Sequence, residues 1–119
     1  MSTKATPLAL VYDGTTLDGL VFRATSGCPP TLADFRSHKS LGLPYPPALF
    51  IRATGISAYR TRAALERARR RFGLRPATVT LELRSADIAW AVSGRHGHLT
   101  IWAPPSLLLE KVIQCDDDQ

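Results

Sequence analysis

The segment Ala77–Arg84 reads Ala-Thr-Val-Thr-Leu-Glu-Leu-Arg, and its strict alternation of apolar and polar residues indicates the fold class. Val79, Leu81 and Leu83 fall on one face of an extended chain, because successive side chains of a strand point in opposite directions. The other face carries threonine, glutamate and arginine. The segment therefore predicts a half-buried β-strand with one face in the core.

Shorter apolar runs on both sides of this segment predict further strands. They are Leu8–Tyr12, Leu20–Ala24, Ala48–Arg52, Ile88–Val92, Leu99–Trp102 and Leu107–Ile113. Two helices are expected between them: Leu32–Lys39 after the cap Thr31, and Ala58–Phe72 between the cap Ser57 and the stop Gly73. Strands that cluster at the end of the chain favour an α+β fold. We expect a mostly antiparallel sheet, or two small sheets packed as a split sandwich.

Length and composition are those of one globular domain, residues 1–119. The acidic end of the chain, residues 116–119, is expected to be a disordered tail. No apolar run approaches the roughly 20 residues of a membrane span, and no secretory signal is evident, so a cytoplasmic protein without a membrane partner is expected. Cys28 and Cys115 belong to no metal-binding motif, and we expect free thiols and no metal.

Basic residues outnumber acidic ones by 15 to 10, and arginine is by far the commonest base. Six arginines fall within the predicted second helix: Arg60, Arg62, Arg67, Arg69, Arg70 and Arg71. Such a helix can follow a phosphate backbone, and it could therefore bind RNA. A solvated helix face explains the same pattern.

The stretch Gly94–Trp102 contains His96 and His98 on either side of Gly97. Neutral imidazole is a competent general base near pH 7, and the glycine allows both side chains to approach one ligand. The two histidines could serve as acid and base in RNA cleavage. The alternative is an ordinary surface turn.

Three segments together resemble the mono-ADP-ribosyltransferase family. They are Leu20–Arg23, with an arginine on an early strand; Thr54–Ser57 followed by Tyr59; and Leu99–Trp102, which runs into two prolines. The resemblance implies a cleft between two small sheets that holds NAD as a substrate. It also implies a transferase or an NAD glycohydrolase, of the kind found in bacterial toxin and effector modules.

The resemblance also implies roles for individual residues. Arg23 would contact the phosphates or the adenosine ribose, Ser57 would fix the nicotinamide side, and Tyr59 would stack there. The family's glutamate falls at Thr100, with His98 at the preceding partner position. Threonine cannot supply the negative charge of that glutamate.

Glu82 and Glu110 do not lie in the matching place either. His98 could instead accept the proton or bind a ribose hydroxyl, with His96 beside it. The candidate catalytic residues are therefore His98, His96 and Ser57.

The residues leave three hypotheses open. The first is an ADP-ribosyltransferase-like domain that binds or cleaves NAD or a related nucleotide and has a macromolecular acceptor. The second is an RNA-directed protein, either a nuclease or a binder. The third is an inactive domain that docks a protein partner, such as an antitoxin or a target. Simpler explanations exist for Ser57, as a helix cap, and for Arg23, as an ion-pair partner of Asp13 or Asp18.

Overall fold

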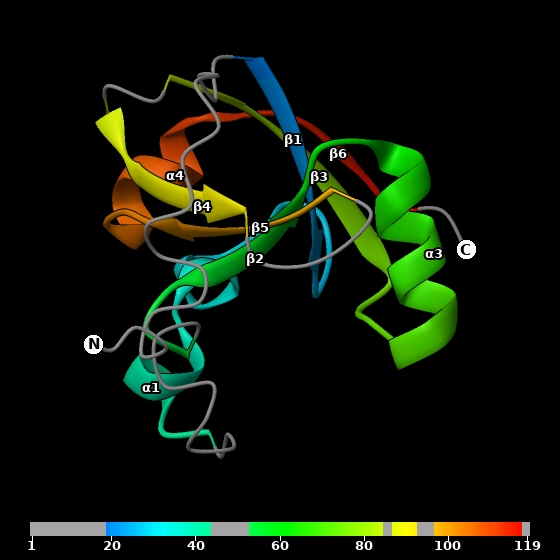
Figure 1. The fold of residues 1–119 in the computed structure, drawn as a ribbon, viewed down its shortest axis with the longest axis horizontal. Helices are drawn as coiled ribbons and strands as arrows, with labels where there is room; N and C mark the ends of the chain where they lie inside the picture. Colours follow the sequence, from blue (N-terminus) through cyan, green and yellow to red (C-terminus); the bar gives the residue numbers. More distant parts are fainter. Residues whose placement is uncertain (1–18, 44–52, 85–86, 93–96, 118–119) are drawn as a thin grey trace.

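The structure, a computed structural model, describes residues 19–43, 53–84, 87–92 and 97–117. The predicted strands Leu8–Tyr12 and Ala48–Arg52, and also His96, lie outside these residues. The described part is an α+β fold in which one antiparallel sheet is flanked by short helices (Figure 1).

Six strands form the sheet in the order β4-β5-β2-β1-β3-β6. In chain order they are β1 (Gly19–Thr25), β2 (Ile56–Tyr59), β3 (Ala77–Leu83), β4 (Ala89–Val92), β5 (His98–Trp102) and β6 (Val112–Asp116). The other elements are a 3₁₀ turn, η2 (Leu32–Phe35), and the helices α1 (His38–Leu41), α3 (Arg62–Phe72) and α4 (Pro105–Glu110). Every neighbouring pair of strands is antiparallel.

The hydrophobic core lies on one face of the sheet. Its members alternate along the strands, as the sequence pattern requires: Val21, Ile56, Ala58, Val79, Leu81, Leu83, Leu99 and Ile101. Phe35 of η2 and Leu108 of α4 complete this cluster. Ala58 of β2 is also fully buried, and its small side chain belongs to this close-packed core.

The opposite face of the sheet is covered in part by α3. This helix buries Ala64, Leu65 and Ala68, and it contacts β1 and β2. The threonines Thr78 and Thr80 of β3 are buried as well. The strand β3 is therefore covered on both faces, and the expectation of a half-buried strand was too simple.

Helix α3 begins four residues later than the sequence indicated. Thr61 is its cap, and its hydroxyl accepts a hydrogen bond from the Ala64 amide. Ser57, the expected cap, lies instead on β2, where it pairs with Thr100 of β5. The predicted end is confirmed, because Gly73 is left-handed at φ 67° and its amide donates to Arg69.

Two further segments differ from expectation. Leu107–Ile113 was expected to be a strand, but its first part belongs to α4 and only its end to β6. Pro105 occupies the first helical turn, where a missing amide hydrogen does no harm. The predicted helix Leu32–Lys39 is divided into η2 and α1, with Ser37 as the cap of α1.

Candidate functional site

The sheet is weakly joined at its centre. Strands β1 and β2 pair at a single position, Phe22 with Tyr59, whereas β1 and β3 pair along the whole of β1. Arg60, the residue after β2, donates its amide hydrogen to the Gly97 carbonyl next to β5. Backbone groups alternate in direction along a strand, so those of Ser57, three residues earlier, face β1. The two halves of the sheet therefore diverge next to Ser57.

The side chain of Arg23 bridges this gap. Its Nη1 donates to the Ser57 carbonyl oxygen at 2.6 Å, and its Nε donates to the Asp34 carbonyl oxygen at 2.9 Å. The arginine on β1 supplies the hydrogen-bond donor that a backbone amide of the neighbouring strand would supply in a regular sheet. Arg23 thus fixes both Ser57 and η2, a role beyond the expected ion pair with Asp13 or Asp18, which lie outside the described residues.

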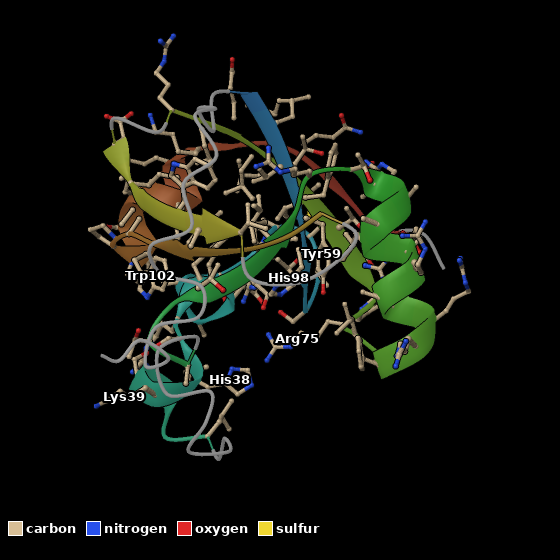
Figure 2. The ribbon with its side chains drawn as sticks, viewed as in Figure 1. His38, Lys39, Tyr59, Arg75, His98 and Trp102 are labelled. Carbon is tan, nitrogen blue, oxygen red and sulfur yellow. A yellow bond between two sulfur atoms is a disulfide. The ribbon has the colours of Figure 1, made fainter. Side chains whose placement is uncertain are left out.

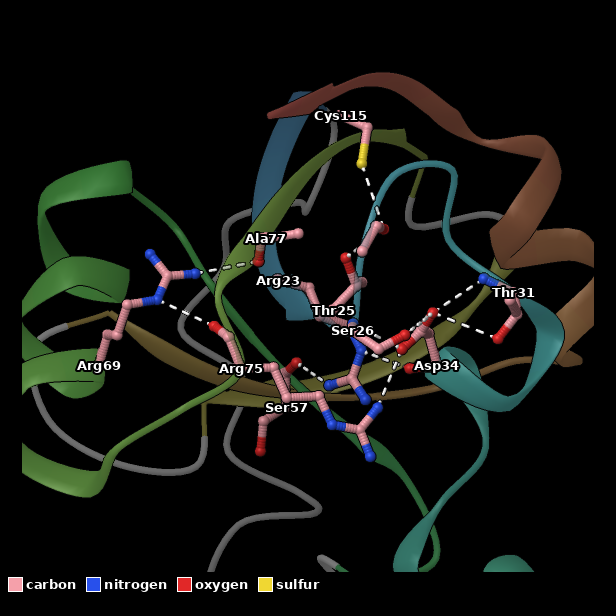
Figure 3. A network of polar contacts seen from close by, with 11 residues as sticks. Arg23, Thr25, Ser26, Thr31, Asp34, Ser57, Arg69, Arg75, Ala77 and Cys115 are labelled. Carbon is pink, nitrogen blue, oxygen red and sulfur yellow. Dashed lines mark hydrogen bonds and ion pairs between the residues drawn. The ribbon is translucent and has the colours of Figure 1, made fainter. Parts of the chain in front are cut away.

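Asp34 organises the loop between β1 and α1 (Figure 3). Its side chain is 1% exposed, yet both carboxylate oxygens are satisfied. Oδ1 accepts from the Ser26 amide and from Nη1 of Arg75, both at 2.9 Å. Oδ2 accepts from the Thr31 amide at 2.8 Å and from the hydroxyls of Ser26 and Thr31. Burial alone would raise the pKa of Asp34, but the hydrogen bonds from Thr31 and Ser26 outweigh it, and the pKa lies below its ordinary value.

Two guanidinium groups, those of Arg23 and Arg75, lie near the single carboxylate of Asp34. Burial and repulsion by Arg75 lower the pKa of Arg23 to about 10, while Asp34 raises it only partly back. Arg23 still carries its charge at neutral pH. The Arg75 side chain is 51% exposed and contacts Asp34 through one nitrogen, so much of its guanidinium faces outward.

Ser57 and His98 form a hydrogen-bonded pair. The distance from Ser57 Oγ to His98 Nε2 is 3.0 Å, and the two residues come from neighbouring strands β2 and β5. The His98 ring stands edge-on to Tyr59, with centroids 5.1 Å apart. Burial raises the pKa of Tyr59, with Arg23 opposing this shift, so the phenol is neutral near pH 7. His98 begins β5 rather than lying within a turn.

Arg23, Arg75, Ser57, Tyr59 and His98 border one pocket of about 510 Å³, a size typical of small-molecule sites. In Figure 2 Tyr59, His98 and Arg75 lie between α3 and α1, and His38 lies on α1. The polar lining consists of Arg23, Arg36, Arg75, His38, His98, Ser57 and Tyr59. The apolar lining includes Leu41, Leu43, Leu74 and Ile56. The lining of the pocket thus contains both cationic and apolar side chains.

The expected site residues are brought together in part. Arg23, Ser57, Tyr59 and His98 all line the pocket, although they are distant in sequence. Thr100 does not: it is 1% exposed, and Gly55 lies close against its side chain.

Three pocket residues were missed by sequence reasoning. Arg75, Arg36 and His38 belong to no recognisable motif. Asp34, which binds Arg75 next to the pocket, was not among the expected site residues either. Its capping contact with Thr31 was nevertheless a usable signal.

The arginine-rich helix makes many contacts within the protein. Arg69 donates to the carbonyls of Arg75 and Ala77 and to the Thr78 hydroxyl, and it also pairs with Glu66. It therefore joins α3 to the start of β3 next to the pocket.

Other arginines near this helix also have partners. Arg62 forms an ion pair with Asp116 at 2.7 Å, and Arg60 lies over the Trp90 ring. Asp116, which was assigned to the tail, is the last residue of β6. These contacts account for much of the charge pattern without RNA.

Cys28 and Cys115 form a disulfide, so the expectation of free thiols was wrong. The bond joins the loop after β1, which also carries Ser26, to the edge strand β6. The two positions are 87 residues apart, and the fold brings their Cα atoms to 5.7 Å. This distance is ordinary for a disulfide.

In the described residues, no group of three or more His, Cys, Asp or Glu side chains could hold a metal ion. None of the helices in that part of the chain has the length and apolar character needed to cross a membrane.

Comparison with known proteins adds no further information. No family model, no curated protein and no solved structure matches this chain. The site must therefore be interpreted from its own geometry.

Proposed function

We propose that the pocket binds NAD or a related nucleotide, as an ADP-ribosyltransferase-like domain would. The observation that carries the proposal is the convergence of Arg23, Ser57, Tyr59 and His98 on one pocket. These are the residues that the family resemblance associates with NAD. The four positions come from the neighbouring strands β1, β2 and β5.

The chemistry of the lining supports a nucleotide. A dinucleotide combines an anionic pyrophosphate with flat rings, and the lining of the pocket contains both arginines and apolar side chains. Arg75 and Arg36 would meet the phosphates, because arginine donates two parallel hydrogen bonds to such groups. Tyr59 and the lining leucines would suit a base or a nicotinamide ring.

The proposal is one of binding in the first place. Cleavage of the glycosidic bond proceeds through a cationic sugar, which the family stabilises with a glutamate. Thr100, at the corresponding position, is buried and does not line the pocket. Glycosyl transfer to an acceptor, and with it the toxin or effector role, remains the further part of this proposal.

The disulfide also supports a proposal about the cellular compartment of the protein. Such bonds persist mainly in oxidising surroundings. The bond between Cys28 and Cys115 supports passage through such a compartment, as for an exported toxin or effector, rather than permanent residence in the cytoplasm.

The test is a thermal shift titration with NAD, ADP-ribose and nicotinamide. NAD and ADP-ribose should raise the melting temperature, because a ligand that binds only the native state stabilises it. Arg75→Ala should abolish the shift. Arg70→Ala, which removes the same charge from an exposed position on α3, should retain it.

The absence of any shift at millimolar NAD would overturn the proposal. RNA retention that is lost on Arg70→Ala would favour the RNA-directed hypothesis. Capture of a protein partner without any nucleotide effect would favour the interaction domain.

A further inference from the structure

The pair formed by Ser57 and His98 has the arrangement of an activated nucleophile. A serine hydroxyl is a weak nucleophile until a neighbouring base accepts its proton, and hydrogen-bond contact between the two is the structural sign of such a pair. Here Oγ and Nε2 are 3.0 Å apart at the pocket wall, and Ser57 is exposed toward solvent. If the bond is donated by the hydroxyl, the imidazole carries its own proton on Nδ1.

Both members of the pair are held in place by the surrounding structure. Arg23 binds the carbonyl of Ser57 and so fixes the backbone that carries the hydroxyl. The edge-on ring of Tyr59 restricts the orientation of the His98 imidazole. A positioned nucleophile and base shorten the path to reaction, because less freedom must be lost at the transition state.

The charge of the pocket indicates which reaction such a pair would serve. Arg23, Arg36 and Arg75 line the same pocket, and Arg75 presents a half-exposed guanidinium. Guanidinium groups stabilise a transition state in which negative charge gathers on phosphoryl oxygens.

We propose that Ser57 attacks phosphorus in the anhydride of the bound nucleotide, with His98 as the general base. The inference rests on the proposed function, since it names the bond that is cleaved in the same pocket. Arg75, which lines the same pocket, meets the charge that develops on the phosphoryl oxygens. Arg23 is a positioning residue.

The step balances as follows for NAD. The Ser57 Oγ–P bond forms on the adenosine phosphate, and the bridging P–O bond breaks. The serine proton passes to His98 Nε2 and from there to the phosphate of the leaving nicotinamide mononucleotide, which takes the electron pair of the broken bond. Neutral His98 then accepts a proton from the water that attacks the nucleotidyl-serine. It returns this proton to Ser57 Oγ as the Oγ–P bond breaks, which releases adenosine monophosphate and free Ser57.

An alkyl fluorophosphonate tests the nucleophile without any nucleotide. The full chain with its disulfide intact is incubated with the probe, and mass spectrometry locates the adduct that forms as fluoride leaves. We expect labelling of Ser57, slowed roughly 100-fold in His98→Asn, the low end of the effect of a general base. Ser106, an exposed serine of α4, serves as the internal control and should stay unlabelled.

A variant that fails to fold must be separated from one that lacks the base. Circular dichroism is therefore recorded for His98→Asn, and His98→Gln is tested beside it. Labelling of both folded variants at the wild-type rate would overturn the proposal. So would an adduct on Ser106 in preference to Ser57.

The products of NAD distinguish this inference from the proposed function. Adenosine monophosphate and nicotinamide mononucleotide, absent in Ser57→Ala, would support attack on phosphorus. Release of free nicotinamide would overturn it while leaving nucleotide binding intact. A thermal shift with NAD but no reaction at Ser57 would also refute the inference alone, whereas labelling of Ser57 without any NAD effect would refute the proposed ligand.

Discussion

Replacing Asp34 by asparagine should destabilise the protein by an amount that follows from the hydrogen bonds of its two oxygens. Oδ1 accepts from the Ser26 amide, and Oδ2 accepts from the Thr31 amide. An asparagine has one oxygen and one NH₂ group, so either orientation turns a donor toward one of these fixed backbone amides. An amide that loses its acceptor in a buried place costs about 1–3 kcal/mol.

The same substitution removes the charge that pairs with Arg75. This side chain is half exposed, so solvent screens the pair, and its contribution is at most about 1 kcal/mol. The expected loss in the free energy of unfolding is therefore about 1–4 kcal/mol. Asp87→Asn is the matched control, because Asp87 is exposed and forms a long ion pair of 3.8 Å with Lys111. This substitution should lower the free energy of unfolding by no more than about 1 kcal/mol.

Urea denaturation at several pH values measures both the magnitude and its origin. The pKa of folded Asp34 lies below its ordinary value, so the carboxylate contributes stability above the unfolded pKa of about 3.9. This contribution is lost as the pH falls through the folded pKa. The difference between wild type and Asp34→Asn should therefore shrink below about pH 4. A difference under 1 kcal/mol at pH 7, or one that grows in acid, would contradict the reasoning.

Two other predictions concern the disulfide and Gly55. Reduction of the disulfide, which closes a loop of 87 residues, should lower the free energy of unfolding by about 2–5 kcal/mol; unchanged urea midpoints with and without reductant would contradict this. Gly55→Ala should cost about 1–3 kcal/mol, because an added Cβ would lie 2.7 Å from the Thr100 side chain and 2.8 Å from the Ile101 carbonyl oxygen. Gly27→Ala meets nothing within 4 Å and is the control, and equal melting temperatures of the two variants would refute the steric argument.

The fold class was predictable because its signal is local. The alternation of residues 77–84 needs only neighbouring residues to be recognised, and β3 follows it closely. The start of α3 was not predictable in this way. Ser57 and Tyr59 are followed by good helix formers, but their pairing with β5, about 40 residues away, holds them in a strand.

The candidate site was predictable only where a pattern of residue types existed. Arg23, Ser57 and His98 were found through the spacing that the family resemblance supplied. Arg75 has no such pattern, since it lies in the turn after α3 and reaches the pocket only because Asp34 binds it. The disulfide was missed for a related reason: neither cysteine has a neighbouring motif, and only the fold brings the loop after β1 to the edge strand.

The charge of the pocket follows from the divergence of β1 and β2. Where the strands separate, the Ser57 carbonyl receives its hydrogen bond from a guanidinium instead of a backbone amide, so a cation is built into the centre of the sheet. One buried carboxylate, Asp34, then lies near both Arg23 and Arg75, and burial together with repulsion by Arg75 lowers the pKa of Arg23. Asp34 alone does not neutralise the positive charge of Arg23 and Arg75, and the proposed dinucleotide, with its two negative charges, would do so. The positive charge that the proposed pyrophosphate would meet therefore arises where the pairing of β1 and β2 is broken.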